Sequence, residues 1–146
     1  MNTFFIQPCL FFAGRCEEAL AFYKEAIGAE TEMLMRYSDS PEPCAPGMIP
    51  AGYESKVMHA SFRVGTTVLM ASDGCGGMDP FSGFSLSLSV ADEAEADRAF
   101  AALLEGGEVV MPLARTFWSP KFGMLKDRFG LGWMISTVAG CGEDNA

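Results

Sequence analysis

The sequence is poor in the groups that hold nucleic acids and anionic membranes. Its 10 lysine and arginine residues stand against 19 acidic residues, which gives a net charge of −9 at pH 7. The basic residues form no cluster along the chain. Because phosphate contacts need clustered lysine and arginine, we expect neither a nucleic acid nor a membrane as partner.

The sequence also lacks the cysteine and histidine patterns of a zinc protein or a disulfide scaffold. Its five cysteines are odd in number and form no CxxC pair, and His59 is the single histidine. We therefore expect reduced thiols in a cytoplasmic protein. No apolar run is long enough to cross a membrane. The apolar N-terminal stretch does not fit a signal peptide, because it has no basic leader region and is interrupted by Gln7 and Pro8.

An internal repeat divides the chain into two similar halves. The segments FIQPCLFFAG and EEALAFYKEAIGAE are matched later by FSGFSLSLSV and EAEADRAFAALLEGGEV. In each copy an apolar, strand-like stretch precedes a helical stretch that ends in glycine. A repeat of this size implies two similar units that need each other to bury their faces. We expect one domain over residues 1–146, made of module 1 (about 4–74) and module 2 (about 81–138).

Residue periodicity predicts the order β-α-β-β-β in both halves. Helices are expected at 15–27 and 92–105, where apolar residues recur at helical spacing and glycine follows. Strands are expected at 4–13, 30–37, 56–64, 67–73, 84–90 and 109–113, with a last hairpin that turns near 127–130. The proline-rich segment 38–52 is predicted to be a long loop of the functional or mobile kind.

The clearest local signal is a hairpin around Gly65-Thr66, where glycine fits the first position of a two-residue turn. If Val64 and Thr67 flank this turn, opposed residues share a face of the sheet. One face then carries His59, Ser61, Arg63, Met70 and Ser72. The other face is predicted to be core: Met58, Ala60, Phe62, Val64, Leu69 and Ala71.

Each half has one helix and can therefore cover only one face of its strands. We predict an α+β fold in which two βαβββ modules form a curved sheet around a concave cleft. The cleft is expected to carry His59 and the serine face of the strand FSLSLSV, formed by Ser85, Ser87 and Ser89. Concave sites lined by apolar groups with a few polar ones are the usual place for small ligands.

These features together resemble one known family. The paired modules, the EALAFYKEAIGAE helix, the TFWSPKFG run and the KDRFGLGWMI segment are similar to the PhnB-like branch of the vicinal oxygen chelate superfamily, often labelled demethylubiquinone methyltransferase-like. That superfamily includes glyoxalase I, the bleomycin-resistance proteins and the extradiol dioxygenases. The resemblance runs from about Phe5 to Val138 and implies the glyoxalase/bleomycin resistance fold.

The resemblance also implies a divalent metal held by histidine or glutamate from four strands. Carried over residue by residue, the ligand positions fall at Pro8, Met70, Ser85 and Met134, and a shift by one residue recovers no histidine or glutamate. Proline, thioether and hydroxyl groups are poor partners for such ions. We therefore expect no metal and no cofactor. The methyltransferase label has no support either, since no GxGxxG-like turn leads from a strand into a helix of a parallel sheet.

His59 is the strongest single candidate for a functional residue. It could bind a ligand or act as general acid or base, or it could be a structural histidine bonded to Ser72 or Asp73. Arg63 could pair with an anionic ligand or with a nearby carboxylate. Trp118 is expected in a loop at the mouth of the cleft. The candidate ligand-binding set is His59, Ser61, Arg63, Met70, Ser72, Ser85, Ser87, Trp118 and Met134.

The serine face has several interpretations. Its hydroxyls could line the pocket, meet solvent or belong to a dimer interface. The sequence has no GxSxG elbow that would make one of the serines a nucleophile.

Two functions from different classes follow from these residues. The first is a metal-independent protein that captures a small organic molecule in the cleft, as the bleomycin-resistance relatives do. The second is an enzyme of unknown reaction, metal-independent or with an atypical metal, that uses His59 as acid or base. The fold itself does not decide between them.

We also expect a homodimer, because each half-sheet leaves strand edges and a serine face that natural proteins usually cover. Light scattering at micromolar concentration should give twice the mass of the chain. A monomer mass would contradict this expectation, while a dimer that exchanges modules and one that does not would both satisfy it.

Overall fold

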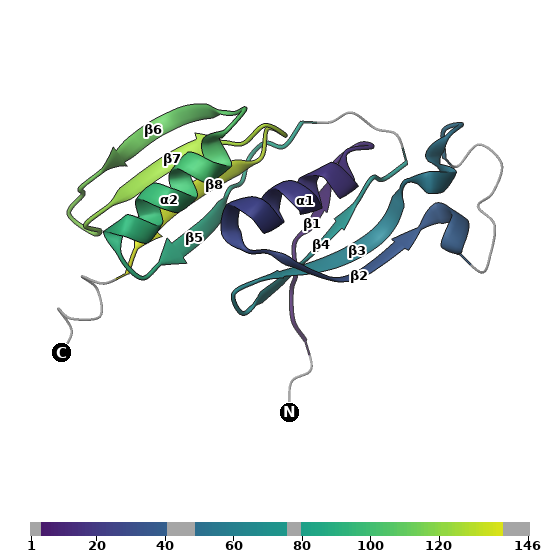
Figure 1. Cartoon of the computed structure of the whole chain (residues 1–146), viewed down its shortest axis with the longest axis horizontal. Coiled ribbons are helices and arrows are strands. Elements are labelled where there is room, and N and C mark those ends of the chain that lie inside the picture. The colour runs from purple at the N-terminus through teal and green to yellow at the C-terminus, as the bar shows by residue number, and fades with distance from the viewer. Residues whose placement is uncertain (1–3, 41–48, 76–79, 139–146) are drawn as a thin grey trace. The chain divides into compact units, whose positions relative to one another are not determined.

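The computed structural model describes residues 4–40, 49–75 and 80–138 (Figure 1). The chain divides into two compact units, unit 1 over residues 1–78 and unit 2 over residues 79–146, and each is described here by itself. Both units have the order β-α-β-β-β. The predicted α+β class and the predicted βαβββ repeat are therefore confirmed.

Unit 1 is a four-stranded mixed sheet with the strand order β1-β4-β3-β2 and one helix. Its main elements are β1 (Cys9–Phe11), α1 (Cys16–Ile27), β2 (Glu30–Arg36), β3 (Val57–Val64) and β4 (Thr67–Ser72), with short 3-10 turns at Tyr37–Asp39 and Tyr53–Ser55. β1 runs parallel to β4, and the other neighbours are antiparallel. Helix α1 lies across one face of this sheet (Figure 1).

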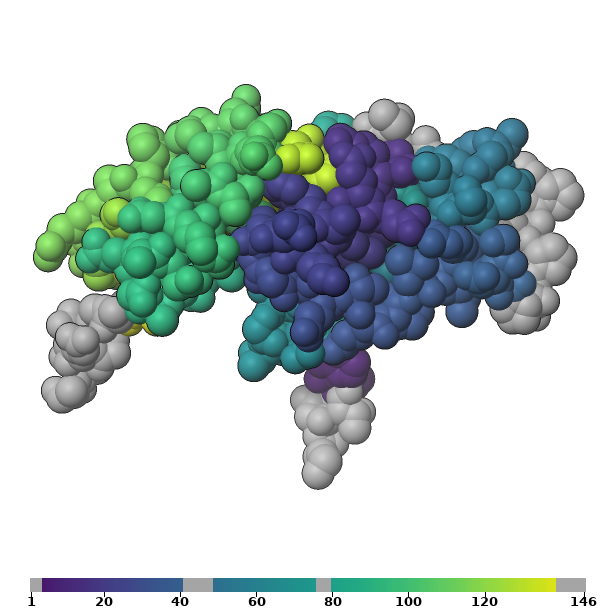
Figure 2. Space-filling view, viewed as in Figure 1, coloured from purple at the N-terminus to yellow at the C-terminus, as the bar shows by residue number. Residues whose placement is uncertain are grey.

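Unit 2 repeats this arrangement with the strand order β5-β8-β7-β6. Its elements are β5 (Leu86–Val90), α2 (Glu93–Leu104), β6 (Glu108–Ala114), β7 (Phe122–Lys126) and β8 (Gly132–Thr137). The strand β5 is parallel to β8, as β1 is to β4. Helix α2 lies across one face of its own sheet, and the outer surface of each helix is visible in the space-filling view (Figure 2).

The core of unit 1 lies between α1 and the sheet. The ring of Tyr23 stacks on Phe62 with centroids 6.2 Å apart. The buried residues of the sheet are Leu10, Val57, Ala60, Phe62, Leu69 and Ala71. The helix ends where the sequence predicts, at Gly28, whose φ of 72° is the left-handed conformation that glycine adopts most easily.

The core of unit 2 is built in the same way from α2 and its sheet. The buried residues are Ala96, Ala99, Phe100 and Leu103 on the helix and Leu125, Trp133 and Ile135 on the strands. Gly123 of β7 lets α2 pack close to the sheet, because a Cβ atom at this position would come within 2.9 Å of the Phe100 ring. A larger residue at 123 would push the helix from the sheet.

The hairpin register predicted around Gly65-Thr66 is confirmed. Val64 pairs with Thr67 and Ser61 pairs with Met70. The first strand, in contrast, is much shorter than the predicted 4–13. Pairing begins at Cys9, because Pro8 has no N–H to donate and only its carbonyl accepts, from the Met70 N–H.

The predicted loop at 38–52 lies only partly within the described residues, because residues 41–48 are outside them. The 3-10 turn Tyr37–Asp39 overlaps its start, and the 3-10 turn Tyr53–Ser55 follows its end. In the part of the chain that the structure describes, no helix is long and apolar enough to cross a membrane.

A buried carboxylate connects the helix of unit 1 to its sheet. Asp73 is 2% exposed, and its Oδ1 accepts hydrogen bonds from the N–H groups of Gly14 and Cys16, both at 2.8 Å. Its Oδ2 accepts from the Val57 N–H at 2.9 Å. Unit 2 has a comparable carboxylate in Asp127, which accepts from two backbone N–H groups and from the indole of Trp133.

Replacing Asp73 by alanine should therefore lower the free energy of unfolding by roughly 3 kcal/mol, because three N–H groups lose their acceptor. Asp73→Asn should cost less, since its amide oxygen can keep the two bonds at Oδ1. The matched control is Asp92→Ala, which removes the exposed N-cap of α2 and its single bond to the Glu95 N–H and should cost about 1 kcal/mol. Urea denaturation at neutral pH measures all three. Equal losses for Asp73→Ala and Asp92→Ala would contradict the role given to Asp73.

Candidate functional site

The face of each sheet opposite its helix is where the candidate residues lie. In unit 1 the pairing register assigns to this helix-free face Cys9 and Phe11 of β1, Met70 and Ser72 of β4, His59, Ser61 and Arg63 of β3, and Glu30, Met33 and Met35 of β2. Paired residues share a face of a sheet, and alternation assigns the residues between them to the helix side. The predicted grouping of His59, Ser61, Arg63, Met70 and Ser72 on one face agrees with this register.

One row of side chains crosses this face from edge to edge. Cys9 pairs with Met70, Met70 with Ser61, and Ser61 with Met33. We call these four residues the unit 1 row. It is uncharged and contains a thiol, a hydroxyl and two thioethers.

His59 lies next to this row, opposite Met35 of β2. Its side chain is half-buried. Within the described part of the chain, no hydrogen bond or ion pair joins its imidazole to another residue. The ring therefore has both nitrogens available for a ligand or a water molecule.

The two partners considered for a structural histidine are engaged elsewhere. The carboxylate of Asp73 accepts from three backbone N–H groups, so it faces the α1 terminus and not the imidazole. Ser72 is buried, and its Oγ accepts from the Gly74 N–H at 2.9 Å. Of the two interpretations of His59, the structural one thus finds no partner among these residues.

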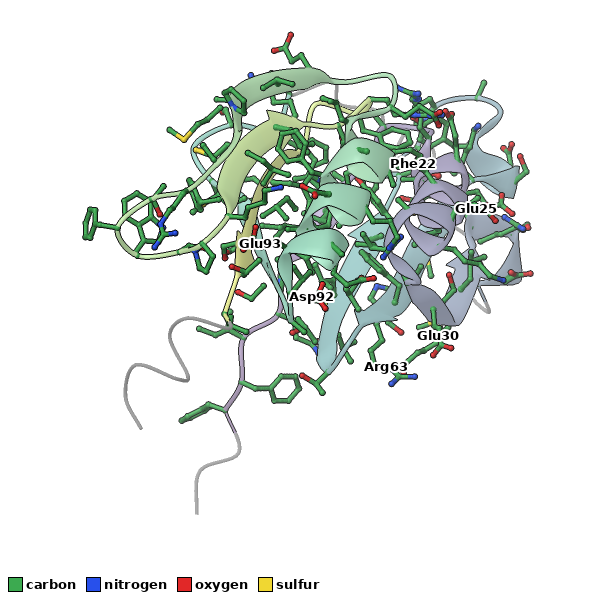
Figure 3. The ribbon with its side chains drawn as sticks, turned by 60° about the vertical axis from the view of Figure 1, so that its left-hand side comes forward. Phe22, Glu25, Glu30, Arg63, Asp92 and Glu93 are labelled. Carbon is green, nitrogen blue, oxygen red and sulfur yellow. The ribbon has the colours of Figure 1, made fainter. Side chains whose placement is uncertain are left out.

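Of the two partners considered for Arg63, an anionic ligand or a nearby carboxylate, the structure shows carboxylates. Its guanidinium lies 2.7 Å from Glu30 and 2.9 Å from Glu32, both in β2, and Figure 3 shows Arg63 beside Glu30. All three side chains are exposed. The positive charge of Arg63 is therefore neutralised locally, which leaves little attraction for an anionic ligand.

Unit 2 carries an equivalent row on its own helix-free face. Ser87 pairs with Met134, Met134 with Met124, and Met124 with Met111. We call these four residues the unit 2 row. Ser89, Ser136 and Phe122 lie on the same face, one pair of residues further along the strands.

Matching the two rows gives an equivalence between the units. Met70 corresponds to Met134, because each pairs in parallel with the first strand of its unit and antiparallel with its third. By the same matching, Phe122 occupies in unit 2 the place that His59 has in unit 1. Only the unit 1 face therefore has an ionisable ring at this position.

In the pairing register, the residues opposite Met70 and Met134 differ from the carried-over positions Pro8 and Ser85, by one residue in unit 1 and by two in unit 2. Cys9, and not Pro8, lies opposite Met70, and Ser87, and not Ser85, lies opposite Met134. Ser85 lies just before β5, where its hydroxyl would be 2.8 Å from a Cβ atom on Gly132. Ser87 itself is exposed.

The donors at these positions do not fit the divalent ion that the superfamily resemblance implies. They are a thiol, a hydroxyl and two thioethers, whereas such ions prefer carboxylate oxygen and imidazole nitrogen. Burial raises the pKa of the Cys9 thiol, which disfavours the thiolate that metals bind. Among the residues that the structure describes, no group of three histidine, cysteine, aspartate or glutamate side chains could hold an ion.

Trp118 lies in the connection between β6 and β7, as predicted, and is 48% exposed. Its ring contacts those of Phe117, at a centroid distance of 4.7 Å, and Phe122, at 5.3 Å. Because Phe122 belongs to the helix-free face of unit 2, this contact places Trp118 at one end of that face.

The sequence missed several residues of the two faces, namely Cys9, Phe11, Met33, Met35, Met111, Phe122 and Met124. The strands β2 and β6 each contain register shifts, which break the simple alternation from which a face is read. Met124 and Phe122 lie in a regular strand, and alternation from Met134 across the last hairpin was a signal that could have found them.

Comparison with known proteins gives the same assignment of the fold and adds the family. The family model described as 3-demethylubiquinone-9 3-methyltransferase matches residues 5–136. Protein YjdN from Escherichia coli (strain K12) is 36% identical over 142 residues, which cover 91% of this chain and 95% of YjdN.

Solved structures extend this result. Protein PA1353 from Pseudomonas aeruginosa is 43% identical, with a TM-score of 0.80 over 92% of this chain and 98% of PA1353. A putative 3-demethylubiquinone-9 3-methyltransferase, PhnB protein, from Bacillus cereus is 30% identical, with a TM-score of 0.72 over 90% of this chain and 98% of its own.

A more distant structure shows the fold alone. The glyoxylase/bleomycin resistance protein/dioxygenase domain from Frankia sp. EAN1pec is 13% identical, with a TM-score of 0.63 over 94% of this chain and 98% of that domain. The fold predicted from the repeat is thus the glyoxalase/bleomycin resistance fold. The chain belongs to the PhnB-like family, whose model is described as 3-demethylubiquinone-9 3-methyltransferase.

Proposed function

We propose that this chain binds a small organic molecule on the helix-free face of unit 1, with His59 as the polar anchor and without a divalent metal. The observation that carries the proposal is the imidazole of His59. It lies half-buried beside the uncharged unit 1 row, and no described residue uses its nitrogens. A ligand can therefore hydrogen-bond to it without displacing an existing bond.

The neighbours of His59 suit an organic ligand. Met35 lies opposite it, and Met70 and Ser61 belong to the adjacent row. Binding sites for small molecules are mainly apolar, with a few polar groups that fix orientation. Methionine side chains are flexible and polarisable, so they adapt to the outline of a ligand.

A second candidate function is catalysis, and the same imidazole favours it. A histidine with free nitrogens can accept or donate a proton if a substrate places its reacting group within hydrogen-bond distance. On this alternative the ligand of unit 1 is a substrate, and His59 is its acid or base. Binding is the function we prefer, because no second described residue on the face is arranged to assist proton transfer.

Methyl transfer, which the names of the family model and of the Bacillus cereus relative suggest, is not part of the proposal. Common enzymes of that kind hold the methyl donor at a glycine-rich turn of a parallel sheet. In the described residues each sheet has one parallel pair of strands, and the other pairs are antiparallel. We further propose that the protein acts as a cytoplasmic homodimer, on the basis of the reduced state expected for its cysteines and of its open strand edges.

The role of His59 can be tested before any natural ligand is known. His59→Ala and His59→Gln should leave the melting temperature unchanged, because no described partner loses a hydrogen bond. They should weaken, by about tenfold or more, whichever compounds from a chemical library raise the melting temperature of the wild type. Met58→Leu, at the neighbouring position on the opposite side of β3, is the matched control and should keep this response.

A structural histidine would behave differently. Its removal would cost about 1–3 kcal/mol, which corresponds to a drop of several degrees in a domain of this size. Such a drop in the His59 variants, or unchanged compound binding, would count against the proposal.

The metal part of the proposal has its own test. The purified protein should contain no stoichiometric zinc, nickel, manganese or iron, and a chelator should leave its melting temperature unchanged, because a thiol, a hydroxyl and two thioethers hold such ions poorly. Elemental analysis and thermal melts with and without chelator measure this. About one tightly bound ion per chain would overturn it.

A further inference from the structure

The connection between β6 and β7 holds two aromatic side chains at the surface of unit 2. Phe117 is 97% exposed and Trp118 is 48% exposed, and their rings meet edge to face at 4.7 Å. Large apolar side chains that gather at one exposed place mark contact sites. Aromatic rings in particular prefer such edge-to-face and offset arrangements with further rings.

Hydrogen bonds fix the backbone that carries these rings. The hydroxyl of Ser119, which is buried, lies 2.8 Å from the Lys121 carbonyl and 3.3 Å from the Thr137 N–H. Thr116 closes the turn from the other side, because its N–H donates to the Ser119 carbonyl at 2.9 Å. The turn is therefore already ordered in the folded protein, so a ligand that binds there does not have to pay the entropic cost of ordering it.

The ordered turn places Trp118 against the helix-free face of unit 2. Its ring contacts Phe122 at 5.3 Å. Phe122 lies two residues before Met124 in β7, and Met124 pairs with Met134. Along this face, the ring of Trp118 is thus followed by the ring of Phe122 and then by the thioethers of Met124 and Met134.

We propose that Trp118, Phe122, Met124 and Met134 form a subsite in unit 2 that takes the aromatic ring of a small organic compound. This subsite lies wholly in unit 2 and goes beyond the function proposed for the face of unit 1. Thioether sulfur makes favourable contacts with aromatic rings, and methionine adapts to their position. Ser87 and Ser136, each beside Met134 or Phe122 in the register, can hydrogen-bond to a substituent on the ring.

Charge restricts the ligand further. The chain has a net charge of −9, so a neutral or cationic aromatic compound is favoured over an anionic one. Lys126, two residues after Met124 in β7, lies opposite the carboxylate-bearing Glu108. The subsite itself has no ionisable side chain.

A set of matched compounds tests the subsite directly. The probes are 1-naphthylmethanol, 1-naphthylmethylammonium and 1-naphthoate, with decahydro-1-naphthylmethanol as the saturated control. Spectra of protein labelled with carbon-13 at the methionine methyls follow Met124 and Met134 in the subsite and Met58 outside it. The first two probes should shift the subsite methyls upfield through the ring current and leave Met58 unchanged, and the naphthoate should bind more weakly. No shift, or an equal shift with the saturated control, would overturn the inference.

Substitution then separates the subsite from a general apolar surface. Trp118→Ala should weaken naphthylmethanol binding at least tenfold, because one face of the ring loses its aromatic partner. Phe84→Ala is the matched control, since Phe84 is also an exposed aromatic residue of unit 2, at 46%. The Phe84→Ala variant should bind naphthylmethanol as tightly as the wild type does. Equal losses in the two variants would overturn the subsite.

A second copy of the chain is the competing occupant of these rings. If Trp118→Ala changed the mass in light scattering from dimer to monomer, the rings would belong to an interface between copies, and the inference would fall. An unchanged mass supports it. The variant His59→Gln recognises failure of the proposed function separately. Naphthyl binding that survives this change supports the subsite, whose contacts all lie in unit 2. Unaltered binding of the library compounds would reject only the role of His59.

Discussion

Each sheet of this protein is covered by one helix, and the side chains of a strand alternate between its two faces. Together these two constraints decide which residues meet solvent or a ligand. Because Leu10, Phe62 and Ala71 must lie under α1, their neighbours Cys9 and Ser61 must lie on the opposite face. A slip of one residue in the register would reverse both faces at once. The candidate site of unit 1 is therefore a consequence of how its core is packed.

Local signals explain which parts of this arrangement could be predicted from the sequence. A two-residue turn at Gly65-Thr66 fixes a hairpin without reference to the rest of the chain, so the face that carries His59 followed directly. The helices were predictable from their spacing and from the glycine after α1. The repeat then implied the βαβββ order and, through the resemblance, the family.

The features that escaped prediction depend on contacts between distant segments. β1 pairs with β4 across the whole of unit 1, and no turn sets that register, so Cys9 was not identified on the face and the strand was predicted too long. Parallel pairs of this kind leave little local trace. Register shifts in β2 hid Met33 and Met35 for a related reason, since a bulge interrupts the alternation that identifies a face. The methionine rows became visible only when the cross-strand pairs were known.

The chemical groups of the two rows decide whether their faces need an ion in order to be stable. A face that gathers carboxylates and imidazoles for an ion is strained without it, because like charges repel and polar groups lack partners. Here the rows are thioether, thiol and hydroxyl groups, and among the described residues no buried side-chain nitrogen or oxygen lacks a hydrogen bond. No buried polar side chain among the described residues therefore needs an ion to complete its hydrogen bonds. For the two proposals made above, selectivity would come from the shape of each face, from the imidazole of His59 in unit 1 and, separately, from the aromatic rings of unit 2.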